Sequence, residues 1–243
     1  MADAFVPLCA SGEDCAIMFA RTPEPGRVKS RLCTRLTPEQ ACRLHCASTN
    51  DVMELLDRSL RGVPQWLFLS ERPETSLKSS GLRLPHGFGC AIQEGGNLGE
   101  RMSAAFVRAF DSGARRVVIF GSDSPTLPSQ IVQQAFREMA ECDLVLGPTE
   151  DGGYYLIGCR RFDAGLFQAV EWSTPRTLEQ TLANARRLDY RVRLLETWFD
   201  LDEWNDVERV MADACRGAPV PYHLAAFLKQ LEAEGTLEGS DPK

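Results

Sequence analysis

Residues 117–125 read Val-Val-Ile-Phe-Gly-Ser-Asp-Ser-Pro, four apolar residues followed at once by a polar turn. Such a run, rich in β-branched residues, predicts a buried strand. The carboxylate of Asp123 at the tip of that strand is costly to bury unless a partner satisfies it. We therefore predict that Asp123 binds Mg²⁺ or Mn²⁺. The alternative is that Asp123 caps a following helix, which Pro125 and Pro128 make plausible.

Six further apolar runs flank this one, and segments with a helical period lie between many of them. The predicted strands lie near residues 15–19, 66–69, 90–92, 144–146, 154–157 and 192–195. The predicted helices span 38–60, with Thr37 as cap and Pro38 in the first turn, 100–110, 128–139 and 177–188. This alternation predicts an α/β fold in three layers, with a mostly parallel sheet whose ligand site lies beyond the carboxyl ends of the strands.

Composition and charge narrow the class of protein. The chain has 243 residues, 44% of them apolar and 25% charged, which is typical of a globular protein. No linker or repeat divides it, so one domain is expected. A net charge of −7 argues against a nucleic-acid partner, because a duplex demands a broad basic face. A single small phosphorylated ligand needs only a local basic loop.

The nine cysteines are scattered, without a CxxC pair, and indicate free thiols rather than disulfides or a zinc ribbon. Cys42 and Cys46 share one helix face, where packing is favoured over metal binding. No stretch approaches the ~20 apolar residues that span a bilayer, and no secretion signal opens the chain, so we expect a cytoplasmic protein without a membrane partner.

The basic loop follows the first predicted strand, at residues 21–31. Gly26 permits close approach of the backbone, while Arg27, Lys29 and Arg31 supply positive charge. A polyphosphate is the natural partner of such a loop, and a solvated turn is the alternative. The loop is neither a Walker loop nor a dinucleotide fingerprint.

A second unusual loop follows the fifth strand, at residues 147–155, which read Gly-Pro-Thr-Glu-Asp-Gly-Gly-Tyr-Tyr. We interpret Glu150 or Asp151 as a base or sugar-hydroxyl acceptor, and Tyr154 as a stacking wall, with Gly152 and Gly153 shaping a loop around the substrate. A purely structural turn is the alternative.

Three further segments carry candidate site residues. Asp200 and Asp202 lie on the same side of an extended chain and face one cation, unless Asp202 caps a helix. The turn at 95–102 offers backbone N–H groups and Arg101 to an anion. Trp172 closes over a base or sugar ring, or belongs to the core.

Taken in order, these motifs resemble the glycosyltransferase-A-like proteins of the domain-of-unknown-function 2064 group. That group is related to molybdenum-cofactor and phospholactate nucleotidyltransferases. The resemblance covers about residues 14–210, through Pro25-Gly-Arg-Val-Lys-Ser-Arg-Leu32, Asn97-Leu-Gly-Glu-Arg-Met102, Gly121-Ser-Asp-Ser-Pro125, Gly147–Gly158, Trp172-Ser-Thr174 and Asp200-Leu-Asp202.

The resemblance implies a nucleotide-diphospho-sugar transferase fold in which Arg21, Lys29 and Arg31 hold nucleotide phosphates and Asp123 coordinates the metal. Asn97 and Arg101 join the nucleotide-binding set. Asn97 replaces an aspartate that is usual in the family and keeps its shape without its charge, and Ser30 replaces a threonine.

Three functions follow as hypotheses. The first is a metal-dependent transferase that moves a sugar from a nucleotide sugar, and the second is a nucleotidyltransferase that releases pyrophosphate from a nucleoside triphosphate. The third, suggested by Asn97, is a binding module with degenerate catalysis. We expect a flexible N-terminus at 1–13, the transferase-like domain at 14–215, and a helical extension and tail at 216–243, with Phe227, Leu228 and Leu231 on its buried face. The sequence does not predict an oligomeric state.

Overall fold

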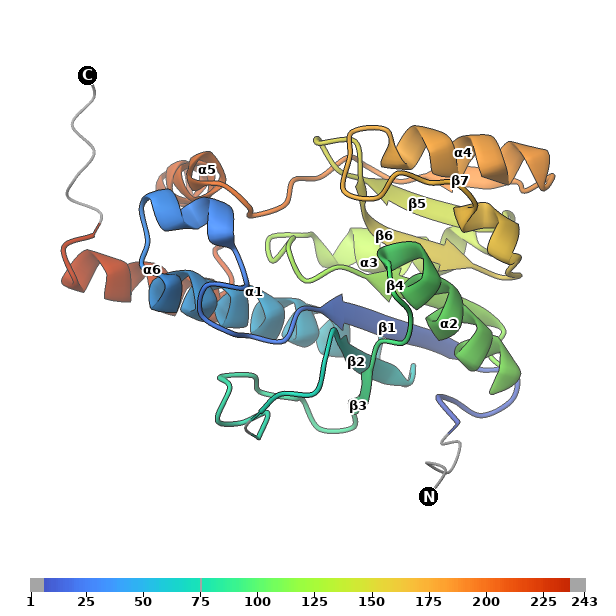
Figure 1. Cartoon of the computed structure of the whole chain (residues 1–243), viewed down its shortest axis with the longest axis horizontal. Coiled ribbons are helices and arrows are strands. Elements are labelled where there is room, and N and C mark those ends of the chain that lie inside the picture. Colours follow the sequence, from blue (N-terminus) through green and yellow to red (C-terminus); the bar gives the residue numbers. More distant parts are fainter. Residues whose placement is uncertain (1–6, 75, 237–243) are drawn as a thin grey trace.

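The computed structural model describes residues 7–74 and 76–236 (Figure 1). Its centre is a seven-stranded sheet in the order β3-β2-β1-β4-β6-β5-β7. The strands are β1 (Asp14–Ala20), β2 (Gln65–Leu69), β3 (Gly89–Ile92), β4 (Arg116–Phe120), β5 (Leu144–Pro148), β6 (Tyr154–Cys159) and β7 (Val192–Leu194). Only β6 runs antiparallel to its neighbours in this sheet. The predicted α/β fold with a mostly parallel sheet is confirmed.

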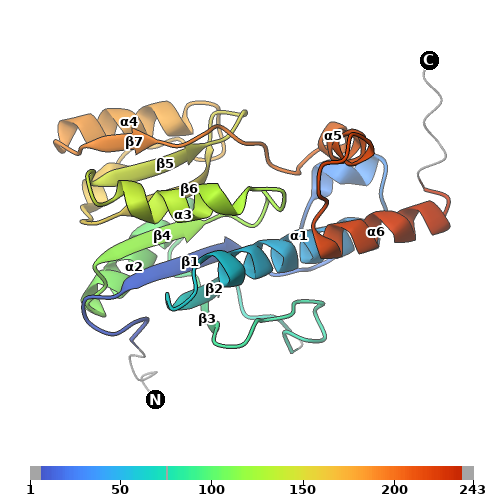
Figure 2. The same cartoon turned by 180° about the vertical axis from the view of Figure 1, so that it is seen from behind.

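Helices cover both faces of the sheet, which Figures 1 and 2 show from opposite sides. They are α1 (Pro38–Ser59), α2 (Leu98–Asp111), α3 (Ser129–Glu138), α4 (Thr177–Arg187), α5 (Trp204–Cys215) and α6 (Tyr222–Ala233), with short 3₁₀ turns η1 (Ser30–Thr34) and η2 (Ala164–Phe167). Alternate β1 residues point to opposite faces, as a pleated strand requires. Ala16 and Met18 pack with α1 and α3, whereas Cys15 and Ile17 pack with α2 and α4.

A third apolar cluster lies beside the sheet, where the first half of α1 meets α5 and α6. Figure 1 shows α6 alongside α1. Leu44 of α1 packs there with Val207 of α5 and with Leu224, Phe227 and Leu231 of α6. Leu228 is only partly buried at its rim. The helical extension therefore packs on the domain through most of the face predicted for it.

Local sequence signals explain where α1 begins. Thr37 and Gln40 form a reciprocal capping box, and Pro38 occupies the first turn. These features satisfy backbone N–H groups that the helix itself leaves unpaired. The predicted start at residue 38 is confirmed.

The ends of the chain are described only in part. The predicted flexible segment 1–13 lies outside the described residues up to position 6, and the tail does so after position 236. Leu8 is buried, and its carbonyl accepts a hydrogen bond from the Trp66 indole at 2.7 Å. In the part of the chain described here, no helix is both long and apolar enough to cross a membrane. All nine cysteines are free thiols.

Candidate nucleotide and cation site

Three loops meet where the chain order of the sheet reverses. From β1 the chain proceeds outward to β2 and β3, then returns to β4 on the other side of β1. Ligands in open α/β sheets bind at such a switch point, beyond the carboxyl ends of the strands. The loop after β1 carries Lys29, and the turn after β4 carries Asp123. The segment before α5 reaches the same point because Leu201 N–H donates to the carbonyl of Asp123 at 2.7 Å.

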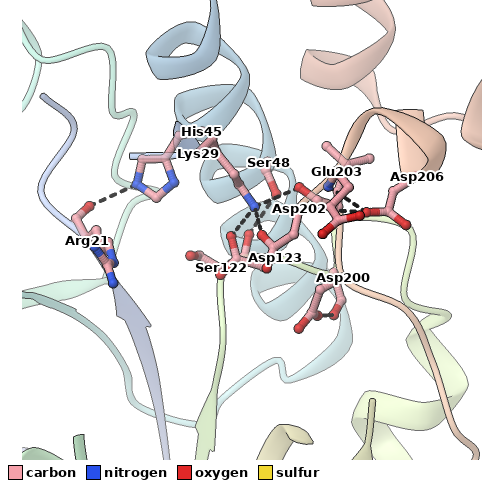
Figure 3. Close-up of polar contacts among 12 residues, drawn as sticks. Arg21, Lys29, His45, Ser48, Ser122, Asp123, Asp200, Asp202, Glu203 and Asp206 are labelled. Atoms are coloured by element: carbon pink, nitrogen blue, oxygen red, sulfur yellow. Dashed lines mark hydrogen bonds and ion pairs between the residues drawn. The ribbon is translucent and has the colours of Figure 1, made fainter. Parts of the chain in front are cut away.

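The ammonium group of Lys29 lies among the acidic side chains of this switch point (Figure 3). It donates to Asp123 Oδ1, to Asp202 Oδ1 at 2.9 Å and to the carbonyl of Leu201 at 2.8 Å. The Lys29 side chain is only 4% exposed, while those of Asp123 and Asp202 are 39% and 41% exposed. A buried ammonium therefore holds two carboxylates that still face the solvent.

The charges in this cluster shift the pKa values of its members. Burial opposes the charged form of Lys29, but Asp123 and Asp202 outweigh it and raise its pKa. Burial likewise opposes the carboxylate of Asp123, yet the Lys29 ammonium holds its pKa below the usual value. Both groups remain charged around neutral pH, so the cluster is an ion pair rather than a shared proton.

Asp200 lies next to this ion pair but makes a different contact. Its Oδ1 accepts a hydrogen bond from Ser124 Oγ at 2.5 Å. Burial, and secondarily the negative charge of Asp123, raises the pKa of Asp200 to about 7. Asp200 thus lies near the Lys29 ammonium, but only Asp202 contacts it.

His45 of α1 is a buried residue at the edge of this site. It is 2% exposed, and its Nε2 donates to the Arg21 carbonyl at 2.9 Å, since a carbonyl can only accept. Burial lowers the pKa of His45, so its imidazole is neutral at physiological pH. Ser48, one turn further on, donates to the Ser122 carbonyl at 2.7 Å. Helix α1 thereby fixes the loops that follow both β1 and β4 (Figure 3).

A cavity of about 430 Å³ opens over these residues. One wall is basic and comes from the first loop, with Arg21, Arg27, Lys29 and Arg31. The acidic floor is Asp123, Asp200 and Asp202. Positive wall and negative floor together suit a phosphorylated ligand with a cation.

Another wall of the cavity comes from the loop between β5 and β6. Asp151 Oδ1 accepts from Thr149 Oγ1 at 2.5 Å and from Gly153 N at 3.1 Å, which folds the loop back on itself. Gly152 has a φ of +88°, and a Cβ there would lie 2.2 Å from the Pro175 carbonyl. Glycine is therefore required at Gly152 to bring Asp151 and Gly153 to the cavity.

Aromatic and apolar side chains complete that wall. Trp172 and Leu98 line the cavity, with Tyr154 beside them. The indole of Trp172 rests on Gly99, where an added Cβ would lie 2.6 Å from Trp172 Cζ2. An indole next to Leu98, itself 40% exposed, offers a flat surface to a base or sugar ring.

Five predicted site residues lie outside the cavity lining. Gly26 is in the exposed part of the first loop, and Gly152 acts through the turn described above. Glu150 points to α5, where both its oxygens accept from Arg209 Nη1 at 3.0 and 2.9 Å. Arg101 donates to the Gly95 carbonyl at 3.1 Å.

Asn97, the fifth of them, caps α2. Its Oδ1 accepts from Glu100 N at 3.0 Å, and its Nδ2 donates to Glu100 Oε1 at 2.7 Å. Asparagine and aspartate cap helices about equally well. Asn97 therefore keeps the capping role of an aspartate, and it is not among the residues that line the cavity.

A second acidic group, Asp51, Glu54 and His223, has ligand atoms within 4.8 Å of one another. Asp51 caps α6, accepting from His223 N at 2.9 Å and Leu224 N at 2.8 Å, while Glu54 pairs with His223 Nε2 at 2.9 Å. These contacts explain the group as the joint between α1 and α6. A larger cavity of about 690 Å³ lies beside it, between α1, α6 and residues 73–74 and 79–83.

Sequence patterns do not single out three contributors to the site. They are His45, which resembles any core residue of an amphipathic helix, Ser124, and the Leu201 carbonyl. Ser124 lies in the Gly121–Pro125 turn, and its position just after a predicted strand is the sequence signal that could have placed it at the site. A backbone carbonyl carries no sequence signal.

Comparisons with known proteins identify the family and the fold of the chain. Residues 57–174 match the family described as uncharacterized protein conserved in bacteria, DUF2064. A protein of Desulfovibrio desulfuricans G20, provisionally named a nucleotide-diphospho-sugar transferase, is 31% identical with a TM-score of 0.81, over 91% of this chain and 96% of that one. No curated protein matches the chain.

Two other solved structures share the fold at lower identity. Rv0371c from Mycobacterium tuberculosis H37Rv, in a complex with manganese, is 16% identical with a TM-score of 0.51, over 84% of this chain and 100% of that one. A CMP:2-keto-3-deoxy-manno-octonic acid synthetase complexed with CTP is 13% identical with a TM-score of 0.52, over 85% and 100% of the two chains. The nucleotide-diphospho-sugar transferase fold is confirmed.

Proposed function

The chain belongs to the DUF2064 family, with the fold of nucleotide-diphospho-sugar transferases, and from this premise we propose that it is a divalent-cation-dependent transferase acting on a nucleotide sugar. The observation that carries the proposal is the cavity of about 430 Å³ in which a basic loop faces the acidic cluster at Asp123. A diphosphate with its cation matches both charges.

The oxygen atoms at Asp123 fit a hard divalent cation. Asp123 Oδ1, Asp202 Oδ1 and the Leu201 carbonyl already surround one positive charge, the Lys29 ammonium. Carboxylate and carbonyl oxygens are the ligands that Mg²⁺ and Mn²⁺ take, so Lys29 serves as a stand-in ion. In our proposal Asp123 and Asp202 hold the cation, with Asp200 beside them. A bound cation would neutralise charge on the phosphates of the donor.

The protein's own side chains would perform the rest of the reaction. Arg21 and Arg31 would hold the phosphates and stabilise the charge that develops on the leaving diphosphate. Asp151 would orient an acceptor hydroxyl or remove its proton, since Asp151 lines the same cavity as the basic loop. Trp172 and Tyr154 would cover the transferred group. Glu150, which pairs with Arg209, would support the loop from outside.

The experiment is product analysis with a panel of nucleotide sugars and acceptors, in the presence of Mn²⁺ or Mg²⁺ and in EDTA. We expect release of a nucleoside diphosphate that requires the cation and Asp123. Asp151→Asn should lower turnover while leaving donor binding unchanged, and Glu150→Gln is the matched control. Turnover that does not depend on the cation, or that is unchanged in Asp123→Ala, would contradict the proposal.

A nucleotidyltransferase is the second candidate, favoured by the number of cations on the first loop. Four basic side chains, Arg21, Arg27, Lys29 and Arg31, line one wall, which also suits the charge of a nucleoside triphosphate. The released product separates the two reactions. Pyrophosphate from a triphosphate and a sugar phosphate identifies nucleotidyl transfer, whereas a nucleoside diphosphate identifies glycosyl transfer.

A further inference from the structure

The ammonium group of Lys29 has no donor left for a ligand in this structure. An ammonium carries three N–H donors. They are directed at Asp123 Oδ1, at Asp202 Oδ1 2.9 Å away and at the Leu201 carbonyl 2.8 Å away. Lys29 therefore cannot donate to a phosphate while it keeps these contacts, although it belongs to the basic wall.

The same three oxygens are those that a divalent cation would use. Mg²⁺ binds oxygen at about 2.0–2.1 Å and tolerates little distortion. The Lys29 ammonium occupies the point that all three oxygens share, and a second cation there would compete for the same lone pairs and be repelled by its charge. Engagement of Lys29 therefore opposes the binding of a divalent cation at these oxygens of Asp123 and Asp202.

The backbone at Lys29 has an unfavourable conformation in this structure. Its φ and ψ are 49° and 38°, in the left-handed region that costs a residue with a Cβ roughly 1–2 kcal/mol. Its neighbour Val28 is buried whereas Ser30 is exposed, so the packing of Val28 and the contacts of the Lys29 side chain together hold that conformation. Releasing the ammonium would remove one of the contacts that hold this strained conformation.

We propose that Lys29 is a resident counterion, which neutralises the acidic floor until a diphosphate arrives and then exchanges carboxylate oxygens for phosphate oxygens. The divalent cation takes the position that Lys29 leaves. This proposal rests on the proposed function, because it assumes a phosphorylated donor in the cavity. Its consequence is coupling: the free protein binds the cation weakly, and phosphate and cation strengthen each other's binding.

The test is the affinity for Mn²⁺ alone, without any nucleotide, measured by calorimetry and by the electron paramagnetic resonance signal of free Mn²⁺. Coupling between sites typically changes an affinity roughly 5–150-fold. We expect Lys29→Gln to bind Mn²⁺ at least about tenfold more tightly than the wild type. Arg31→Gln, which removes a neighbouring charge with no contact to Asp123, should change the affinity much less than Lys29→Gln does. Adding Asp123→Asn to Lys29→Gln should abolish the gain.

Equal Mn²⁺ affinity in wild type and Lys29→Gln would overturn the inference. If Lys29→Gln does not fold, the melting temperature of the wild type provides the test. It is measured with Mn²⁺ alone, with pyrophosphate alone and with both together. We expect the pair to stabilise by more than the sum of its members, with almost no effect of Mn²⁺ alone. Full stabilisation by Mn²⁺ alone also overturns the inference. No stabilisation by the pair counts against the proposed function instead.

Discussion

Replacing Asp123 with Asn removes the negative charge nearest to the buried ammonium of Lys29. Breaking a fully buried ion pair from one side costs about 3–5 kcal/mol. Here Asp123 is 39% exposed, and Lys29 keeps Asp202 and the Leu201 carbonyl, so the cost should be smaller. We expect about 2 kcal/mol, which for a chain of this size lowers the melting temperature by roughly 4–8 °C.

The assay is denaturant and thermal unfolding of Asp123→Asn in EDTA, so that no cation contributes. Asp213→Asn is the matched control, because Asp213 pairs with Arg216 on the surface and such pairs contribute up to about 1 kcal/mol. If Asp123→Asn costs no more than Asp213→Asn, the buried cluster does not have the energetic role derived above. Turnover should also fall by at least about 100-fold, the loss typical of a missing electrostatic partner.

Three other predictions concern the surroundings of this cluster. Asp200 has a folded pKa of about 7, above its ordinary value, so its contribution to stability is full below the unfolded pKa and is lost as the pH rises through 7. In EDTA, the free energy of unfolding of the wild type should therefore fall relative to that of Asp200→Asn between about pH 4 and 7. A difference that stays constant over this range would contradict the prediction. Asp51→Ala removes the acceptor for two N–H groups of α6 and should cost about 1–2 kcal/mol with faster hydrogen exchange in α6, whereas a loss no larger than in Glu54→Ala would refute the cap. Gly99→Ala places a Cβ 2.6 Å from Trp172 and should weaken donor binding more than Gly96→Ala, where the nearest atom is a flexible Glu100 oxygen at 3.3 Å; equal affinities would exclude Trp172 from the binding wall.

The fold was predictable because periodicity and strand ends are properties of the sequence. The seven apolar runs correspond to the seven strands, and the positions just after them supply Lys29, Asp123 and Asp151 to one cavity. The predicted ends of some helices differ from the observed ends by a residue or two, because the capping residue extends the helix beyond its apolar pattern. Helix α2 begins at Leu98 rather than Glu100, because Asn97 and Glu100 cap one another.

The finer contacts were not predictable, because they depend on backbone conformation. The left-handed conformation of Lys29 turns its side chain into the acidic floor, and no local pattern distinguishes that from a lysine pointing at a phosphate. Glu150 and Asp151 are adjacent and chemically alike, yet the turn at Gly152 directs one to Arg209 and the other to the cavity. The role of His45 depends on where α1 lies relative to the first loop.

The most direct test of a cation site at Asp123 is the anomalous scattering of Mn²⁺ in crystals grown with a nucleoside diphosphate. We predict one strong peak within bonding distance of Asp123 and Asp202, with the Lys29 side chain turned toward the phosphates. A peak at Asp51, Glu54 and His223 in its place, or a nucleotide bound in the cavity with Lys29 still paired to Asp123 and no peak beside it, would contradict the account.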